Sequence, residues 1–131
     1  MFLIDSSVWI EFLRSDGSQN IKGIVHDLIE KDKVSTCGVI VVEILRGARN
    51  KKDFDALSET FNSIPQIPLD SEVIERAAMW GFSMDRKGYQ VPTTDLFIAS
   101  AAYKRVKILH IDQDFEVISS FFDLEQEKLE R

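Results

Sequence analysis

Five acidic residues stand next to apolar segments, where a carboxylate is expensive to bury. Asp5 follows the triplet FLI, Glu43 lies inside VIVVEILRGA, and Asp95 precedes the apolar run LFIASAA. Asp112 and Asp114 follow the segment ILHI. Because an ionised carboxylate in apolar surroundings needs a partner or a cation, we expect these acids to share one site. Two simpler interpretations stay open: Glu43 on an exposed polar stripe, and Asp95 as a first-turn acid that complements the helix dipole.

Carboxylates that converge repel one another unless a cation lies between them. Their hard oxygen ligands suit Mg²⁺ or Mn²⁺. A zinc site is disfavoured, because the single cysteine, Cys37, and the two histidines, His26 and His110, are scattered along the chain. We expect Cys37 to be a core residue, His26 to lie on a polar helix face, and His110 to pack inside a strand.

Short apolar runs alternate with longer segments of helical periodicity, and these elements must position the acids. Strands are predicted at residues 2–4, 33–37 and 106–111, with a short strand or turn at 65–70 and an edge strand near the C-terminus. Helices are predicted at 6–14, 21–29, 39–48, 54–61 and 73–86, from Asp95 onward, and at 114–122. Ser6 or Ser7 is the expected cap of the first helix. This alternation predicts an α/β sandwich around a mostly parallel sheet of four or five short strands.

The acids that follow strands are expected at one edge of this sheet. The carboxyl ends of parallel strands share an edge, and ligands bind outside it. Asp5 comes directly after the first strand, and Asp112 and Asp114 follow the strand at 106–111. The helix that begins near Asp95 can present its N-terminus to the same edge.

Length and composition bound the class of protein. A chain of 131 residues fits one domain with a sizeable core, and we assign residues 1–131 to a single domain. Apolar residues make up 44% and charged residues 29%, which is typical of a globular chain. No apolar run approaches the roughly 20 residues of a membrane span, and no signal peptide is evident. A single cysteine and these absences indicate a cytoplasmic protein. We expect the acidic tail at about 125–131 to be frayed.

The net charge of −6 argues against a general polyanion binder, which tends to be basic. The charge is unevenly distributed, however. The segments RGARNKK and YKRVK are basic and contain no acid. Each is either a solvated face or a contact for a specific anion.

Four segments, in order, resemble PIN-domain ribonucleases of the VapC toxin type: MFLIDSSVWIEFL, VIVVEILRGA, VPTTDLFIASAA and ILHIDQDFEVI. No single motif is specific, but their order and helix contexts match over essentially the whole chain. The resemblance implies a PIN-like α/β/α sandwich and a ribonuclease that depends on Mg²⁺ or Mn²⁺. It also implies cleavage of structured RNA such as tRNA, a cognate VapB-type antitoxin as partner, a homodimer, and a higher-order complex with the antitoxin.

Position by position, the resemblance assigns metal binding to Asp5, Glu43, Asp95 and an acid of the DQD segment. We favour Asp112 as the fourth acid because it lies nearer the strand end, with Asp114 as a helper or helix cap. Ser7 corresponds to the hydroxyl residue that the family has two positions after its first acid. His110 and Ile111 stand where the family has a polar residue. Phosphate contacts are expected from the basic segments, through Arg46, Arg49, Lys51, Lys52, Lys104, Arg105 and Lys107.

Three alternatives belong to other classes. A phosphohydrolase of the haloacid-dehalogenase type also starts with an acid after its first strand, but it needs a second aspartate where this chain has Ser7. A receiver domain needs an early acidic pair and a phosphorylatable aspartate at mid-chain, and neither is present. A PIN-like domain that binds RNA or a protein without cutting would gain nothing from clustered repulsive acids. An activity assay on a phosphomonoester and on RNA separates these functions.

Overall fold

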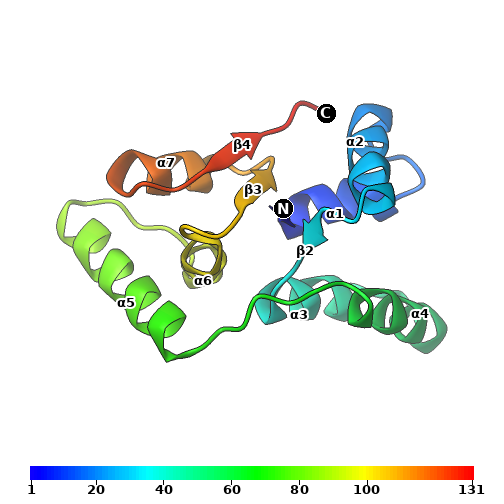
Figure 1. Cartoon of the computed structure of the whole chain (residues 1–131), viewed down its shortest axis with the longest axis horizontal. Coiled ribbons are helices and arrows are strands. Elements are labelled where there is room, and N and C mark those ends of the chain that lie inside the picture. Colours follow the sequence, from blue (N-terminus) through cyan, green and yellow to red (C-terminus); the bar gives the residue numbers. More distant parts are fainter.

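A parallel sheet lies at the centre of the molecule. The computed structural model describes all 131 residues and contains four strands and seven helices (Figure 1). Strands β1 (Phe2–Ile4), β2 (Val34–Ser35), β3 (Lys107–His110) and β4 (Gln126–Lys128) pair in the order β2-β1-β3-β4. All three pairings are parallel. The prediction of an α/β fold with a mostly parallel sheet of four or five short strands is confirmed.

The helices are the crossovers that parallel strands require. Helices α1 (Ser6–Leu13) and α2 (Gln19–Glu30) connect β1 to β2. Helices α3 (Gly38–Arg46), α4 (Lys51–Asn62), α5 (Ser71–Arg86) and α6 (Thr93–Ala102) connect β2 to β3, and α7 (Gln113–Phe121) connects β3 to β4. Figure 1 shows α5, α6 and α7 on one side of the strands and α1 and α2 on the other. None of these helices is both long enough and apolar enough to cross a membrane.

Helix α6 is buried on nearly all sides, which explains its lack of a polar stripe. It packs against α3, α5, α7 and β3, and seven of its residues are buried. Helix α5 approaches it closely at Gly81, where an added Cβ would lie 2.8 Å from Cδ1 of Leu96. Because α6 is clamped in this way, the position of Asp95 in its first turn is fixed by the core.

The large apolar residues of α1 and α4 divide between core and surface. Trp9 and Phe61 are almost fully buried, and their ring centroids lie 5.0 Å apart. Cys37 is also fully buried, as predicted. Leu13 and Phe54, by contrast, are exposed. The first pair therefore serves the core, and the second pair is available to a partner.

The prediction of a frayed tail at about 125–131 is wrong. Residues Gln126–Lys128 form β4 and pair with β3. Leu124 and Leu129 are buried on either side of β4, and the N–H of Leu129 donates to the carbonyl of His110 at 2.7 Å. The charged side chains of the tail lie on an exposed edge strand, where charge discourages pairing with other chains. The edge strand expected near the C-terminus is therefore present, and it lies within the acidic tail.

Two local expectations also need correction. The cap of α1 is Asp5, and neither Ser6 nor Ser7, because the Asp5 carboxylate accepts from the N–H of Ser7. Residues 65–70 contribute only a single parallel bridge, between Thr36 and Gln66, next to β2.

Candidate active site

Asp5 is built into the junction between β1 and α1. Its N–H donates to the Leu109 carbonyl of β3 at 2.9 Å, which ties the junction to the centre of the sheet. Its Oδ2 accepts from the N–H of Ser7 at 3.1 Å and from the Ser7 hydroxyl at 2.6 Å. Burial raises the pKa of Asp5, the two bonds from Ser7 oppose that rise, and repulsion from Asp112 adds to it. Ser7 thus holds the carboxylate in one orientation.

Asp112 and Asp114 lie at the start of α7, directly beyond the carboxyl end of β3. Asp112 is the N-cap of this helix, and its Oδ1 accepts from the N–H of Asp114 at 2.9 Å. The expectation that Asp114 could be the helix cap is therefore wrong, because the cap is Asp112. Asp114 occupies the first turn, with its carboxylate free to face the other acids.

Asp95 is the most perturbed acid of the group. It is only 7% exposed, and its Oδ2 is buried without a hydrogen-bond partner. Burial, followed by repulsion from Asp112 and Asp5, raises the pKa of Asp95 to about 8, from an ordinary value of 3.8. An acid that only complemented a helix dipole would have its ionised form favoured. Asp95 shows the opposite shift, which argues against the simpler interpretation of this residue.

Glu43 approaches the same site from α3. Its Oε1 is buried and has no hydrogen-bond partner. Burial has the largest effect and raises the pKa of Glu43, and repulsion from Asp5 adds to the rise. Ser6 and the positive charge of Arg46 lower this pKa. Glu43 is therefore electrostatically connected to Asp5, and it does not lie on an exposed polar stripe.

The structure thus brings three of the five predicted acids close together. Oxygen atoms of Asp95, Asp112 and Asp114 lie within 4.8 Å of one another. Asp5 repels Asp95 of this cluster, and Glu43 is linked to the site through its repulsion with Asp5. Buried carboxylate oxygens without partners cost free energy. An oxygen-only donor set with two such orphaned atoms is what a hard divalent cation requires. The residues present therefore fit a Mg²⁺ or Mn²⁺ ion.

The basic residues predicted to bind phosphate do not all lie near the acids. Arg46 does, since its charge acts on Glu43. Lys104, Arg105 and Lys107 instead line a pocket with Met1 and Phe2, at the amino ends of β1 and β3. That edge is opposite to the acids, so these three residues cannot flank the site as predicted.

The other basic residues follow α3 and are exposed, and Arg49 lines a pocket that Glu43 also lines. Arg49 pairs with Asp53 at 3.9 Å and Lys51 pairs with Asp55 at 2.8 Å. Lys52 is exposed. Phosphate binding by Arg49, Lys51 and Lys52 stays a prediction.

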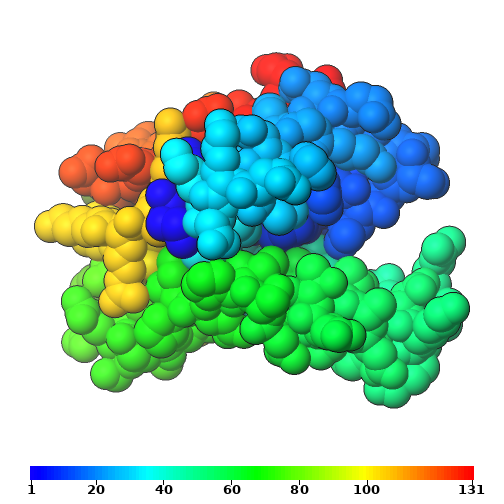
Figure 2. Space-filling view, turned by 45° about the vertical axis from the view of Figure 1, so that its right-hand side comes forward, coloured from blue at the N-terminus to red at the C-terminus, as the bar shows by residue number.

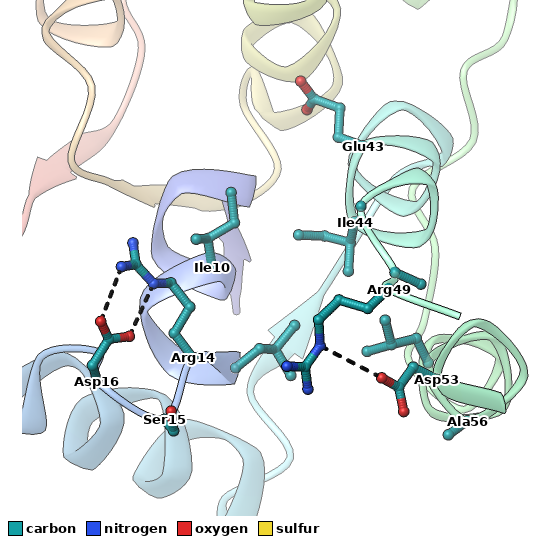
Figure 3. Close-up of a pocket in the computed structure, with 13 residues that line it drawn as sticks. Ile10, Arg14, Ser15, Asp16, Glu43, Ile44, Arg49, Asp53 and Ala56 are labelled. Carbon is teal, nitrogen blue, oxygen red and sulfur yellow. Dashed lines mark hydrogen bonds and ion pairs between the residues drawn. The ribbon is translucent and has the colours of Figure 1, made fainter. Parts of the chain in front are cut away.

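A pocket of about 750 Å³ adjoins the acids on one side. It lies between α1 and the helices α3 and α4, and Figure 2 shows this hollow between the blue N-terminal segment and the green segment below it. Its walls include Ile10, Leu13, Ile44 and Leu57. In Figure 3, the carboxylate of Glu43 points out of the pocket, away from Ile44. Arg14, Asp16, Arg49 and Asp53 also line it, so the pocket is a groove with an apolar wall and charged residues that reaches Glu43.

Sequence reasoning missed three residues that support the acids. Ser6 lowers the pKa of Glu43, and its signal was only its place beside Ser7. His110 accepts from the N–H of Asp112 at 3.1 Å, and Gln126 of β4 lies 2.6 Å from the His110 ring. The departure from the family pattern at His110 was visible, but its partner in the C-terminal strand was not.

Replacement of Asp95 by asparagine should stabilise the metal-free protein by about 1–2 kcal/mol near neutral pH. The raised pKa of Asp95 means that its contribution to stability is fully present below pH 3.8 and is lost as the pH rises to about 8. The asparagine side chain carries no charge, so the variant should lack this decline. Urea unfolding in EDTA across this pH range measures the effect, with the exposed Asp27→Asn as control. A variant less stable than wild type at every pH would make Asp95 a simple helix-terminus acid.

Comparison with known proteins agrees with this geometry. The PIN domain family model matches residues 2–120. Ribonuclease VapC11 of Mycobacterium tuberculosis is 30% identical over 129 residues, which cover 95% of this chain and 96% of that protein.

Solved structures share the fold at lower identity. VapBC2 from Rickettsia felis, bound to a DNA fragment from its promoter, superposes with a TM-score of 0.79 at 13% identity and covers 98% of both chains. VapC20 of Mycobacterium tuberculosis, a toxin that cleaves the sarcin-ricin loop, gives a TM-score of 0.68 at 15% identity, with 89% of this chain and 94% of that chain covered. The PIN domain model covers residues 2–120, and ribonuclease VapC11 is 30% identical along almost the whole chain. The chain therefore belongs to the PIN-domain family, among the VapC ribonucleases.

Proposed function

We propose that this protein is the toxin of a toxin–antitoxin pair and acts as a Mg²⁺- or Mn²⁺-dependent endoribonuclease on structured RNA such as tRNA. The observation that carries this proposal is the set of converging acids with two orphaned oxygens, on Glu43 and Asp95. A domain that only bound RNA would be weakened by such negative charge. Since its substrate RNA is cytoplasmic, we place the protein in the cytoplasm.

The acids would have different roles in binding a cation. Asp5, Glu43 and Asp95 would bind it directly, and Asp112 would hold a second ion or orient the attacking water. When bound, the cation acidifies water and neutralises charge on the scissile phosphate. Ser7 keeps the Asp5 carboxylate oriented through its hydroxyl at 2.6 Å. Asp95, with its pKa near 8, gives up a proton when it becomes a ligand.

An RNA substrate must approach this acidic site along a basic surface that compensates the negative charge of its phosphates. Arg46 is the basic residue placed beside Glu43, and we assign it a phosphate contact. The haloacid-dehalogenase alternative is disfavoured, because the Ser7 hydroxyl is committed to Asp5 and Ile111. A second catalytic carboxylate at that position is what such an enzyme would need.

The groove between α1, α3 and α4 is the proposed docking site for the antitoxin. Ile10 and Leu13 are exposed in its wall although they are large and apolar. The groove reaches Glu43, so a segment bound there could place a basic side chain among the carboxylates in place of the metal. The proposal takes its partner, a VapB-type protein, from the VapBC complexes that share this fold. Homodimer formation stays a prediction.

Changes at the acids should remove RNA cleavage. Asp5→Asn and Asp95→Asn are expected to lower the cleavage rate by on the order of 100-fold or more, because each removes an oxygen ligand. Asp112→Asn should cost more than Asp114→Asn, since Asp112 repels both Asp5 and Asp95, whereas Asp114 repels only Asp95 of these two acids. Cleavage of total RNA and of a phosphomonoester is measured with Mg²⁺, Mn²⁺ and EDTA. Full activity in EDTA would refute metal dependence, and equal losses at Asp112 and Asp114 would refute the ranking.

A charged residue introduced into the groove should weaken binding of the antitoxin without reducing RNA cleavage. Leu13→Asp is expected to reduce antitoxin affinity by about 10-fold or more, because an apolar contact is replaced by a desolvated carboxylate. The matched control is Ile29→Asp on α2, where the wild-type residue is 42% exposed against 44% for Leu13 but lies outside the groove.

The partner for this test is the product of a small gene that overlaps or adjoins the gene for this protein. Affinity is measured by calorimetry, and cleavage by the free variants is measured in parallel. If the two substitutions weaken binding equally, the groove is not the docking site.

A further inference from the structure

His110, the last residue of β3, is fully buried immediately before the acidic turn. Its Nδ1 accepts a hydrogen bond from the N–H of Asp112 at 3.1 Å. Its Nε2 lies 2.6 Å from Oε1 of Gln126 in β4. The ring also packs against Phe115, with centroids 5.0 Å apart. Both ring nitrogens and one ring face therefore have defined partners.

These partners select one tautomer of the imidazole. A backbone N–H can only donate, so the Nδ1 that faces Asp112 must be the unprotonated acceptor. The hydrogen then resides on Nε2 and is donated to Oε1 of Gln126. The amide of Gln126 is oriented in turn by its Nε2, which lies 3.4 Å from the hydroxyl of Ser119. A chain of side chains thus runs from α7 through β4 to the backbone of Asp112.

The turn from β3 into α7 depends on such side-chain acceptors. The N–H of Ile111 donates to the Ser7 hydroxyl at 3.2 Å, and the N–H of Asp114 donates to Asp112 at 2.9 Å. His110 provides the acceptor for the donor between these two. Without that acceptor, a partly buried N–H would lose its partner, and the turn would gain freedom to move the Asp112 carboxylate.

We propose that His110 and Gln126 are a pair of positioning residues that hold Asp112 in place as a cation ligand, with the ring hydrogen of His110 on Nε2. The inference rests on the proposed function, because Asp112 is taken as a metal ligand. Residues that orient ligands typically change metal affinity or activity by about 10–100-fold when they are replaced. The C-terminal strand therefore contributes to the site through Gln126.

Two replacements of His110 distinguish positioning from packing. His110→Asn places a carbonyl oxygen near the Nδ1 position, so it should keep Mg²⁺ affinity within about threefold of wild type. His110→Gln extends its amide toward the Nε2 position and leaves the N–H of Asp112 without an acceptor. It should lower Mg²⁺ affinity by about 10–100-fold.

Replacements on β4 test the second member of the pair. Gln126→Leu removes the acceptor that selects the tautomer, so it should weaken Mg²⁺ binding in the same direction as His110→Gln. Glu127→Gln, on the same strand and exposed, is the matched control and should bind Mg²⁺ like wild type.

Mg²⁺ binding is measured by isothermal titration calorimetry, and thermal unfolding in EDTA reports on packing. Nitrogen-15 NMR of the imidazole reads the tautomer of the wild-type protein without any substitution. Nε2–H in the spectrum, together with weaker Mg²⁺ binding by His110→Gln than by His110→Asn at similar melting temperatures, supports the pair. An Nδ1–H tautomer, or equal losses of Mg²⁺ affinity in both variants, overturns it.

The same experiments separate this inference from the proposed function. A protein that shows the Nε2–H tautomer and the expected ranking of Mg²⁺ affinities, but cleaves no RNA, would retain the positioning pair and lose the ribonuclease. A protein that cleaves RNA with Mg²⁺ but contains Nδ1–H His110 would retain the ribonuclease and lose the pair.

Discussion

Repulsion among carboxylates at the carboxyl edge of the sheet is the main physical constraint on the candidate active site. The parallel pairing of β1 with β3 places Asp5 beside the start of the acidic turn, and the burial of α6 brings Asp95 to the same edge. Each acid would be more stable apart from the others or in water. The fold keeps them together through contacts that are not themselves acidic.

Those contacts come from elements far apart in the chain. Ser7 bonds to Asp5 and to the backbone of Ile111, so one hydroxyl joins α1 to the turn after β3. The close approach of α5 to α6 at Gly81 fixes the first turn of α6. Packing of the core thus offsets the free energy lost to repulsion among the acids. The acids are thereby held together where a cation can bind.

Much of this arrangement could be predicted from the sequence, because its signals are local. Acids at strand ends and inside an apolar helix marked the site, and alternating apolar periodicity marked the α/β fold. The prediction that Lys107 lies near the acids was wrong. Lys107 precedes the apolar part of its strand, so it lies at the edge of the sheet opposite to Asp112.

The remaining errors concern local side-chain geometry and contacts between segments distant in sequence. The capping role of Asp112 depends on side-chain geometry, which does not follow from its spacing to Asp114. The position of β4 within the acidic tail was hidden by its charge, although the strand is flanked by the buried Leu124 and Leu129 and pairs with β3. The bond between His110 and Gln126 became visible only once that strand was in place.

The most direct test of the crowded site is the number of protons released when Mg²⁺ binds. This number follows from calorimetric titration near neutral pH in buffers that differ in ionisation enthalpy. Because the pKa of Asp95 is raised to about 8 in the metal-free protein, that residue holds a proton which a cation must displace. The expected result is release of about one proton per bound ion. Mg²⁺ binding with no proton release would show that the acids are already ionised together, and it would contradict the repulsion on which this view of the site depends.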